Sequence, residues 1–365
     1  MQIKQLLTTF LRSKTFKLLL VCLTILAVIP VLVNDTFFLH VFTLIFVFAI
    51  YAASWNFLAN SGQGSLGHAA FLGIGGFSAA LIGNSISTAI ISIIGVGSLS
   101  VFIQIVVLLL GGLISAGIGL LIGLACVRLK AWYLAMVTFG FSVIANTLSS
   151  QFDSFTNGIN GFAPVKLVPK VSGVLGEYPF YILVISFFVS SILIMHLIMK
   201  SRMGLAFRAI HGNEAEARMI GINTAKYKLI AFVISTFFAG IAGGLYSYFL
   251  GFIQNEIFSP ANSFLPLIMS VIGGLGTVAG PIIGSIFLVS VQQILATPSV
   301  VESLRGSLGP YFPGISNVGP PIAFLIIGII LVVIVIFAPK GLISLFEKAY
   351  KYLTTENKPK EVKIT

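Results

Sequence analysis

Long apolar runs constrain this chain more than any other feature of its sequence. Runs of about 20 residues, the length that crosses the hydrocarbon core of a bilayer, recur along its 365 residues. Only 8% of the residues are charged, against about 25% in soluble domains, so too few charges remain to cover a water-facing surface. The runs are also far longer than the strands of a membrane barrel. The sequence therefore predicts an all-α protein, a polytopic transmembrane helical bundle, and excludes a cytosolic enzyme or a nucleic-acid-binding module.

Hydropathy and helix-breaking residues divide the chain into spans and loops. No small-residue cleavage site follows the first apolar run, 18–33, so we interpret it as an uncleaved span and not as a signal peptide. Residues 84–98 are rich in Ser, Gly and Ile and are predicted to be a loop or part of a re-entrant element. The other predicted spans are 37–59, the glycine-rich 60–83, 101–127, 131–150, 180–199, 229–252, the broken 264–297 and 320–338, with long loops at 151–178 and 298–319.

The positions of Lys and Arg predict the orientation of these spans. Cytoplasmic loops carry an excess of Lys and Arg, and 18 of the 21 basic residues lie in four segments that we place on the cytoplasmic side. This path requires that 60–83 crosses the membrane and that 264–297 enters and returns to the outer side. The net charge of +11 is then a topology signal and needs no nucleic-acid partner. The four basic segments are 1–17, 128–130, 200–228 and 339–365.

Two glycine-rich apolar segments are predicted to lie beside a solute path. Residues 60–76 hold six glycines, each of which costs a helix about 1 kcal/mol relative to Ala, and residues 272–284 are interrupted in the same way. Non-helical backbone at membrane depth is tolerated where it is buried in protein or lines a cavity, and such a pair is typical of a transporter's binding site. The alternative is close packing of small residues between helices. The predicted solute-path residues are Ser65, Gly67, His68, Gly73, Gly273, Gly274, Gly276 and Thr277.

Ionisable residues are scarce in the predicted spans. We interpret His68 as a hydrogen-bonding residue at a helix start or interface, because no acid or second histidine lies near it in the sequence, and we expect no metal site. The span cores carry no charged residue, which disfavours ion coupling and favours a neutral or zwitterionic solute. No phosphate-binding loop for ATP appears either. We therefore expect a protein that is not an enzyme, holds no cofactor and receives energy from another subunit.

The charged segment 200–228 contains a short predicted helix. Asn213 can cap it, the acid Glu214 favours its positive N-terminal end, and Arg218 follows four residues later as an ion-pair partner. Gly221 then ends the helix. The alternative is a solvated connector that only carries the positive charge of the cytoplasmic side. If the helix forms, it offers Ala215, Met219 and Ile220 for packing against another protein.

These segments together resemble a known family. The loop is similar to the cytoplasmic coupling loop of ABC-importer permeases, in which a Glu-Ala-Ala pattern is followed by Gly. Within that group the chain resembles the branched-chain amino-acid permeases over roughly residues 40–345. The blocks that carry the resemblance are 64–71, 133–138, 156–161, 202–245, 273–277 and 337–341.

The resemblance implies a single transmembrane permease domain, 18–338, between a cytoplasmic N-terminal segment, 1–17, and a cytoplasmic tail, 339–365. It implies import of branched-chain or related neutral amino acids across the cytoplasmic (inner) membrane, with ABC ATPase subunits that bind ATP, a second related permease and an extracytoplasmic solute-binding protein as partners. The alternatives are a passive channel for a small neutral solute such as urea or an amide, and a secondary carrier. The coupling residues implied are Gly204, Arg208, Glu214, Ala215, Ala217 and Gly221.

Overall fold

The structure, a computed structural model, describes residues 35–94, 98–126, 129, 131–152, 156–165 and 174–297, and scattered residues between 300 and 344. This part of the chain is all-α apart from one isolated bridge, so the predicted fold class is confirmed. The helices are α3 (Thr36–Ala59), α4 (His68–Ile94), α5 (Ser98–Cys126), α6 (Ala131–Gln151), α8 (Val174–Lys200), α9 (Arg202–Gly212), α10 (Glu214–Met219), α11 (Thr224–Leu250), α12 (Pro260–Gly273) and α13 (Gly280–Ala296), with 3-10 turns η1 (Gly158–Asn160) and η2 (Asn255–Phe258).

Six helices in the described part of the chain are long and apolar enough to cross a membrane, namely α3, α4, α5, α6, α8 and α11. They correspond to predicted spans, and α4 contains the later part of the glycine-rich segment 60–83. The chain is therefore a multi-pass membrane protein. The predicted span 18–33, most of 320–338 and the tail after 344 lie outside the described residues.

Several boundaries differ from the sequence-based expectation, among them the end of α4 and the start of α8. The prediction of a loop or re-entrant element at 84–98 is wrong over most of its length, because α4 continues without a break to Ile94. The segment from Asn84 to Ile94 contains neither Gly nor Pro, so nothing in it stops a helix. Helix α8 likewise begins at Val174, before the predicted 180, with Glu177 in the first turn where a negative charge is favourable.

The centre of the bundle is helix α11, which packs against α3, α4 and α5. Glycines allow its backbone to touch that of α4. A Cβ added at Gly75 would lie 2.2 Å from the Cα of Gly240, and one added at Gly243 would lie 1.8 Å from the carbonyl oxygen of Leu72. Small residues therefore bring the two spans into backbone contact, which is the usual way helices associate in lipid.

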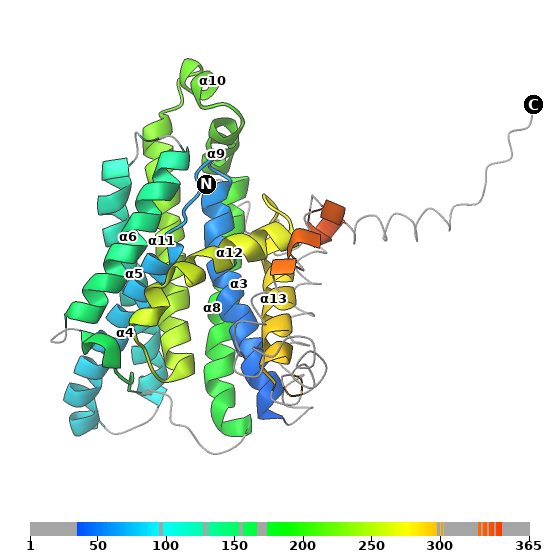
Figure 1. The fold of residues 1–365 in the computed structure, drawn as a ribbon. Helices are drawn as coiled ribbons and strands as arrows, with labels where there is room; N and C mark the ends of the chain where they lie inside the picture. Colours follow the sequence, from blue (N-terminus) through cyan, green and yellow to red (C-terminus); the bar gives the residue numbers. More distant parts are fainter. Residues whose placement is uncertain are drawn as a thin grey trace, which may run out of the picture.

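Helices α12 and α13 form a helix–turn–helix beside α3 (Figure 1). Helix α12 has 14 residues, about 21 Å at 1.5 Å per residue, and lies obliquely across the bundle, so it does not span the membrane. The two helices cross closely, because a Cβ at Gly273 would lie 1.7 Å from the carbonyl oxygen of Gly280. Hydrogen bonds anchor the pair to α3, from the Tyr51 hydroxyl to the Asn262 carbonyl (3.1 Å) and from the Ser270 hydroxyl to the Ala52 carbonyl (3.2 Å).

The connecting segments lie at opposite ends of the bundle. Helices α9 and α10 project from one end, whereas residues 156–165, in the connection between α6 and α8, lie at the other (Figure 1). Phe162 of that connection exchanges two 3.0 Å backbone hydrogen bonds with Ile253, which fixes it to the chain just after α11. This arrangement is the one that the predicted topology requires of the loops 151–178 and 200–228.

Candidate functional site

The segment 200–228 folds into two helices, of which the sequence predicted only the second. Helix α9 is capped by Ser201, whose hydroxyl accepts a hydrogen bond from the amide of Met203. Helix α10 is capped by Asn213, whose side-chain oxygen accepts from the amide of Ala215 at 3.0 Å. After α10 the chain turns at Gly221, whose φ of +86° lies in the left-handed region that favours glycine. The predicted capping and termination of this short helix are confirmed.

Glu214 holds α10 against the start of α11. Its carboxylate pairs with Arg218 on the same helix and with Lys228, which is 14 residues away in sequence and buried. Partial burial alone would raise the pKa of the Glu214 carboxyl, but hydrogen bonds and charge from Lys228 and Arg218 outweigh it, so the pKa is lowered. Because the pKa is lowered, the ion pairs of Glu214 stabilise the folded protein fully above the ordinary carboxyl pKa. This stabilisation is lost only as the pH falls through the lowered pKa.

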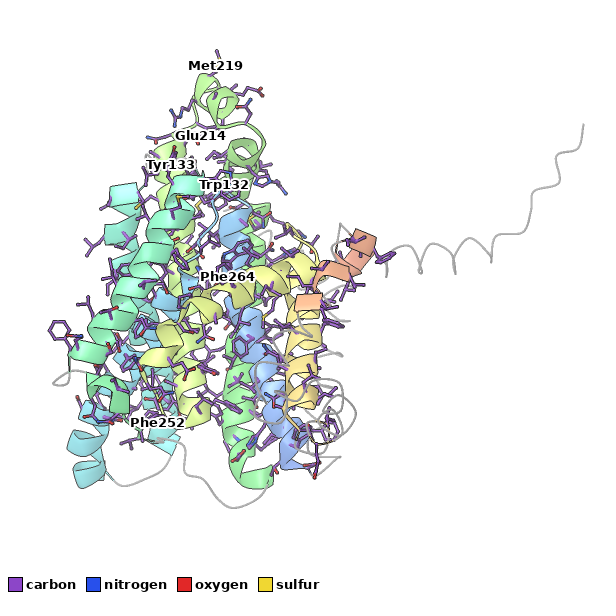
Figure 2. All side chains as sticks on the ribbon, in the orientation of Figure 1. Trp132, Tyr133, Glu214, Met219, Phe252 and Phe264 are labelled. Carbon is purple, nitrogen blue, oxygen red and sulfur yellow. The ribbon has the colours of Figure 1, made fainter. Side chains whose placement is uncertain are left out.

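The six predicted coupling residues divide into an inner and an outer group. Gly204 and Ala217 are buried, and a Cβ at Gly204 would lie 2.0 Å from the carbonyl oxygen of Met199, so these two residues serve packing within the chain. The other four are exposed or half-buried on the projecting surface. Met219 and Ile220 are 87% and 74% exposed, and Figure 2 shows Met219 at the tip. The outer group comprises Arg208, Glu214, Ala215 and Gly221.

The first glycine-rich segment lies in the interior of the bundle. Ser65, Gly67, His68 and Gly73 are all buried. A Cβ at Gly67 would lie 1.6 Å from the carbonyl oxygen of Thr138 in α6, and one at Gly73 would lie 2.3 Å from the ring of Phe258. The helix break that the sequence predicted is confined to residues 60–67, before α4 begins.

His68 is the first residue of α4 and is completely buried. Its Nε2 lies 3.0 Å from the Ser54 hydroxyl and its ring packs 5.5 Å from that of Tyr51, between centroids. The predicted role as a hydrogen-bonding residue at a helix start is therefore confirmed. Two buried polar atoms at this helix start, Nδ1 of His68 and Oγ of Ser65, have no hydrogen-bond partner in the described part of the chain.

The second glycine-rich segment forms the turn between α12 and α13, and an asparagine holds it. Asn56 of α3 accepts a hydrogen bond from the amide of Gly276 (3.0 Å) and donates one to the carbonyl of Thr277 (2.8 Å). Gly273 and Gly274 are buried, whereas Gly276 is exposed, with a φ of +78°. Sequence reasoning missed Asn56. The available signal was an amide pair, Asn56 and Asn60, spaced one helical turn apart in an apolar span.

A cavity of about 200 Å³ opens where this turn meets α3, α8 and α9. Of the predicted solute-path residues, Gly276 and Thr277 line it, while Ser65, Gly67, His68 and Gly73 do not. The residues of the first glycine-rich segment and those of the second therefore do not meet at this cavity. Its polar lining consists of Asn56, Asn60, His196, Lys200, Arg208 and Thr277, and its apolar lining comes mainly from Phe57, Ile192, Met195 and Met199.

A family model and individual relatives of this chain agree on one protein family. The family described as "Branched-chain amino acid transport system / permease component" matches residues 37–338. The chain is similar to the high-affinity branched-chain amino acid transport system permease protein LivM of Escherichia coli, with 28% identity over 76% of this chain and 68% of the relative. It is 24% identical to the probable branched-chain amino acid transport permease protein LivM of Methanocaldococcus jannaschii, over 75% of this chain and 77% of the relative.

A third relative is LivM of Salmonella typhimurium, at 30% identity over 51% of this chain. The aligned region spans only about half of that relative, 49% of its length. No solved structure matches the chain.

Proposed function

The chain belongs to the branched-chain amino acid transport system permease family, and from that premise we propose how it is driven and what it moves. It is the membrane-spanning permease subunit of an ABC importer of the cytoplasmic (inner) membrane, and it translocates branched-chain or related neutral amino acids inward. ATP is hydrolysed by partner ATPase subunits. A second related permease and an extracytoplasmic solute-binding protein complete the complex, and both termini of this chain are cytoplasmic.

The observation that carries this proposal is the braced projection formed by α9 and α10. Glu214 ties α10 to Lys228 at the start of α11, so a push on α10 is transmitted to the central helix of the bundle. Met219 and Ile220 are exposed at the tip of the projection and offer apolar side chains for contact with an ATPase subunit. A passive channel would have no use for this brace.

The charge distribution supports a neutral or zwitterionic solute. Within the six described membrane-length helices, Lys, Arg, Asp and Glu occur only near helix ends, and the buried Lys228 is already paired. A proton- or ion-coupled carrier would usually place an ionisable residue at membrane depth. Backbone groups at helix ends and breaks can instead satisfy the polar groups of an amino acid, as they do in other transporters.

Solute-stimulated ATP hydrolysis by the complete complex in reconstituted membranes tests the proposal. Glu214→Gln keeps the side-chain size but weakens both ion pairs. A charge-assisted hydrogen bond contributes roughly 1.5 kcal/mol or more. Because Glu214 is 30% exposed, water screens its two ion pairs, and we expect the loss of both to cost less than the sum of two such bonds. We expect stimulation to fall about tenfold.

The matched control is Glu216→Gln, on the same turn of α10, whose carboxylate accepts a hydrogen bond from Asn213 and, in the described part of the chain, pairs with no cation. The control should retain most of the stimulation. Equal stimulation in wild type and Glu214→Gln would mean that the projection is a charged connector and would remove the main support for ATP coupling through it.

A further inference from the structure

The cavity between α3, α8, α9 and the α12–α13 turn has a lining with two distinct parts. Phe57, Met195 and Met199 contribute to apolar walls between membrane helices. Two cations also line it, Lys200, the last residue of α8, and Arg208 of α9. A lining that combines apolar side chains with two cations matches a molecule that has a negatively charged head and an apolar remainder.

The described residues around this cavity do not balance its positive charge. Among them, neither Asp nor Glu lines the cavity. The two acids on the same projecting end are engaged elsewhere, Glu214 with Lys228 and Arg218, and Glu216 with Asn213. No ion pair joins Lys200 or Arg208 to a carboxylate in the ranges that the structure describes. The cavity therefore fits an anion better than a zwitterion, whose ammonium group would meet two positive charges and no acid.

The cationic residues of the cavity lie near one end of the helical bundle. Lys200 ends a membrane-length helix, and Trp132 and Tyr133, at the start of α6, are 80% and 59% exposed. Figure 2 shows these two aromatic residues at the end of the bundle that carries Glu214 and Met219. Exposed Trp and Tyr are enriched at the level of lipid headgroups, and basic pockets between helices at this depth suit anionic headgroups.

We propose that this cavity binds the headgroup of an anionic phospholipid that lacks an ammonium group, with the phosphate between Lys200 and Arg208. The glycerol end of the headgroup faces the polar lining at Asn60 and Thr277, while the acyl chains leave along Met195 and Met199. Since Arg208 lies on α9 and Thr277 on the α12–α13 turn, a bound lipid would link these two elements. This inference does not rest on the proposed import function.

Lipid binding by the purified full-length protein tests the proposal. The probe is a fluorescent phosphatidylglycerol in vesicles of phosphatidylcholine. Because Lys200 and Arg208 would contact the bound phosphate, neutralising each should weaken binding about fivefold, so the double variant Lys200→Gln/Arg208→Gln should lose about 25-fold. Lys226→Gln removes an exposed basic residue that does not line the cavity and should leave binding unchanged. Equal losses in the control would show general surface attraction and overturn the proposal.

A second variant keeps both cations and reduces the volume of the cavity. Val278 lines the cavity and is 40% exposed, so Val278→Trp narrows the cavity with little effect on the bundle interior. Binding of phosphatidylglycerol should fall severalfold, while size-exclusion behaviour stays that of the wild type. Unchanged binding would place the lipid elsewhere and overturn the proposal.

Competition distinguishes the source of the anion. Neither soluble glycerol phosphate nor leucine, both added at millimolar concentration, should displace the lipid probe. Displacement by glycerol phosphate would show a site for a free anion, and displacement by leucine would assign the cavity to the solute path. Either result would overturn the lipid assignment. Because the readout is lipid binding and not ATP hydrolysis, its failure is separate from a failure of the proposed import.

Discussion

The two glycine-rich segments share one sequence signature but have different structural roles. In 60–76, the glycines from Gly67 onward lie against the backbone or buried side chains of neighbouring elements. In 272–284 the flanking glycines are packed as tightly, but Gly276 at the centre is exposed, and its amide donates to Asn56 of α3. Glycine content alone therefore does not distinguish a segment that packs tightly in the interior from one that forms an exposed turn. The second segment differs because Asn56 forms hydrogen bonds to its turn.

The largest effect is expected from Gly67→Ala. The added Cβ would lie 1.6 Å from the carbonyl oxygen and 2.2 Å from the carbonyl carbon of Thr138, and backbone atoms of α6 cannot yield as a flexible side chain can. We expect destabilisation of at least about 3 kcal/mol and little folded protein, measured as monodisperse yield in detergent. Gly64→Ala is the control, because nothing lies within 4 Å of its Cβ position. Normal yield of Gly67→Ala would refute the tight contact.

An intermediate effect is expected from Asn56→Leu. This change removes both hydrogen bonds to the turn and leaves the Gly276 amide and the Thr277 carbonyl without this partner, at a cost of about 2–4 kcal/mol. The melting temperature of the purified protein and solute uptake should both fall. Asn60→Leu, whose donated bond goes to the Asn56 carbonyl within its own helix, should cost about 1 kcal/mol. Equal costs for the two variants would mean that Asn56 does not hold the turn.

The smallest effect is expected from Gly276→Ala. Its Cβ position meets only Asn60 Oδ1 at 3.6 Å, an ordinary contact, so the cost comes from the φ of +78° and amounts to about 1–2 kcal/mol. The protein should assemble normally, with a slightly lower melting temperature. Uptake should fall if the turn borders the solute path. If Gly276→Ala behaved like Gly67→Ala, the contrast between the two segments would disappear.

The sequence identified the spans and the local helix signals because these depend on neighbouring residues. Apolar runs of membrane length gave α3, α5, α6, α8 and α11 within a few residues. The cap at Asn213, the ion pair with Arg218 and the turn at Gly221 were predicted correctly, since all lie within one short segment. Helix α9 was missed although its cap, Ser201, is also local, because the basic residues around it were read only as a topology signal.

The contacts between distant segments could be decided only by the tertiary structure. The Glu214–Lys228 brace joins residues 14 apart, and the Asn56 contacts with the turn join residues more than 200 apart. Gly67 was predicted to lie beside a solute path, but whether it borders a cavity or a neighbouring backbone depends on the placement of α6, which no local pattern encodes. The sequence by itself determined that this is a multi-pass helical bundle with a capped projecting helix, because hydrophobicity and capping act over a few residues. Which small residues pack and which line a cavity depended on how the helices approach one another, a property of the assembled bundle.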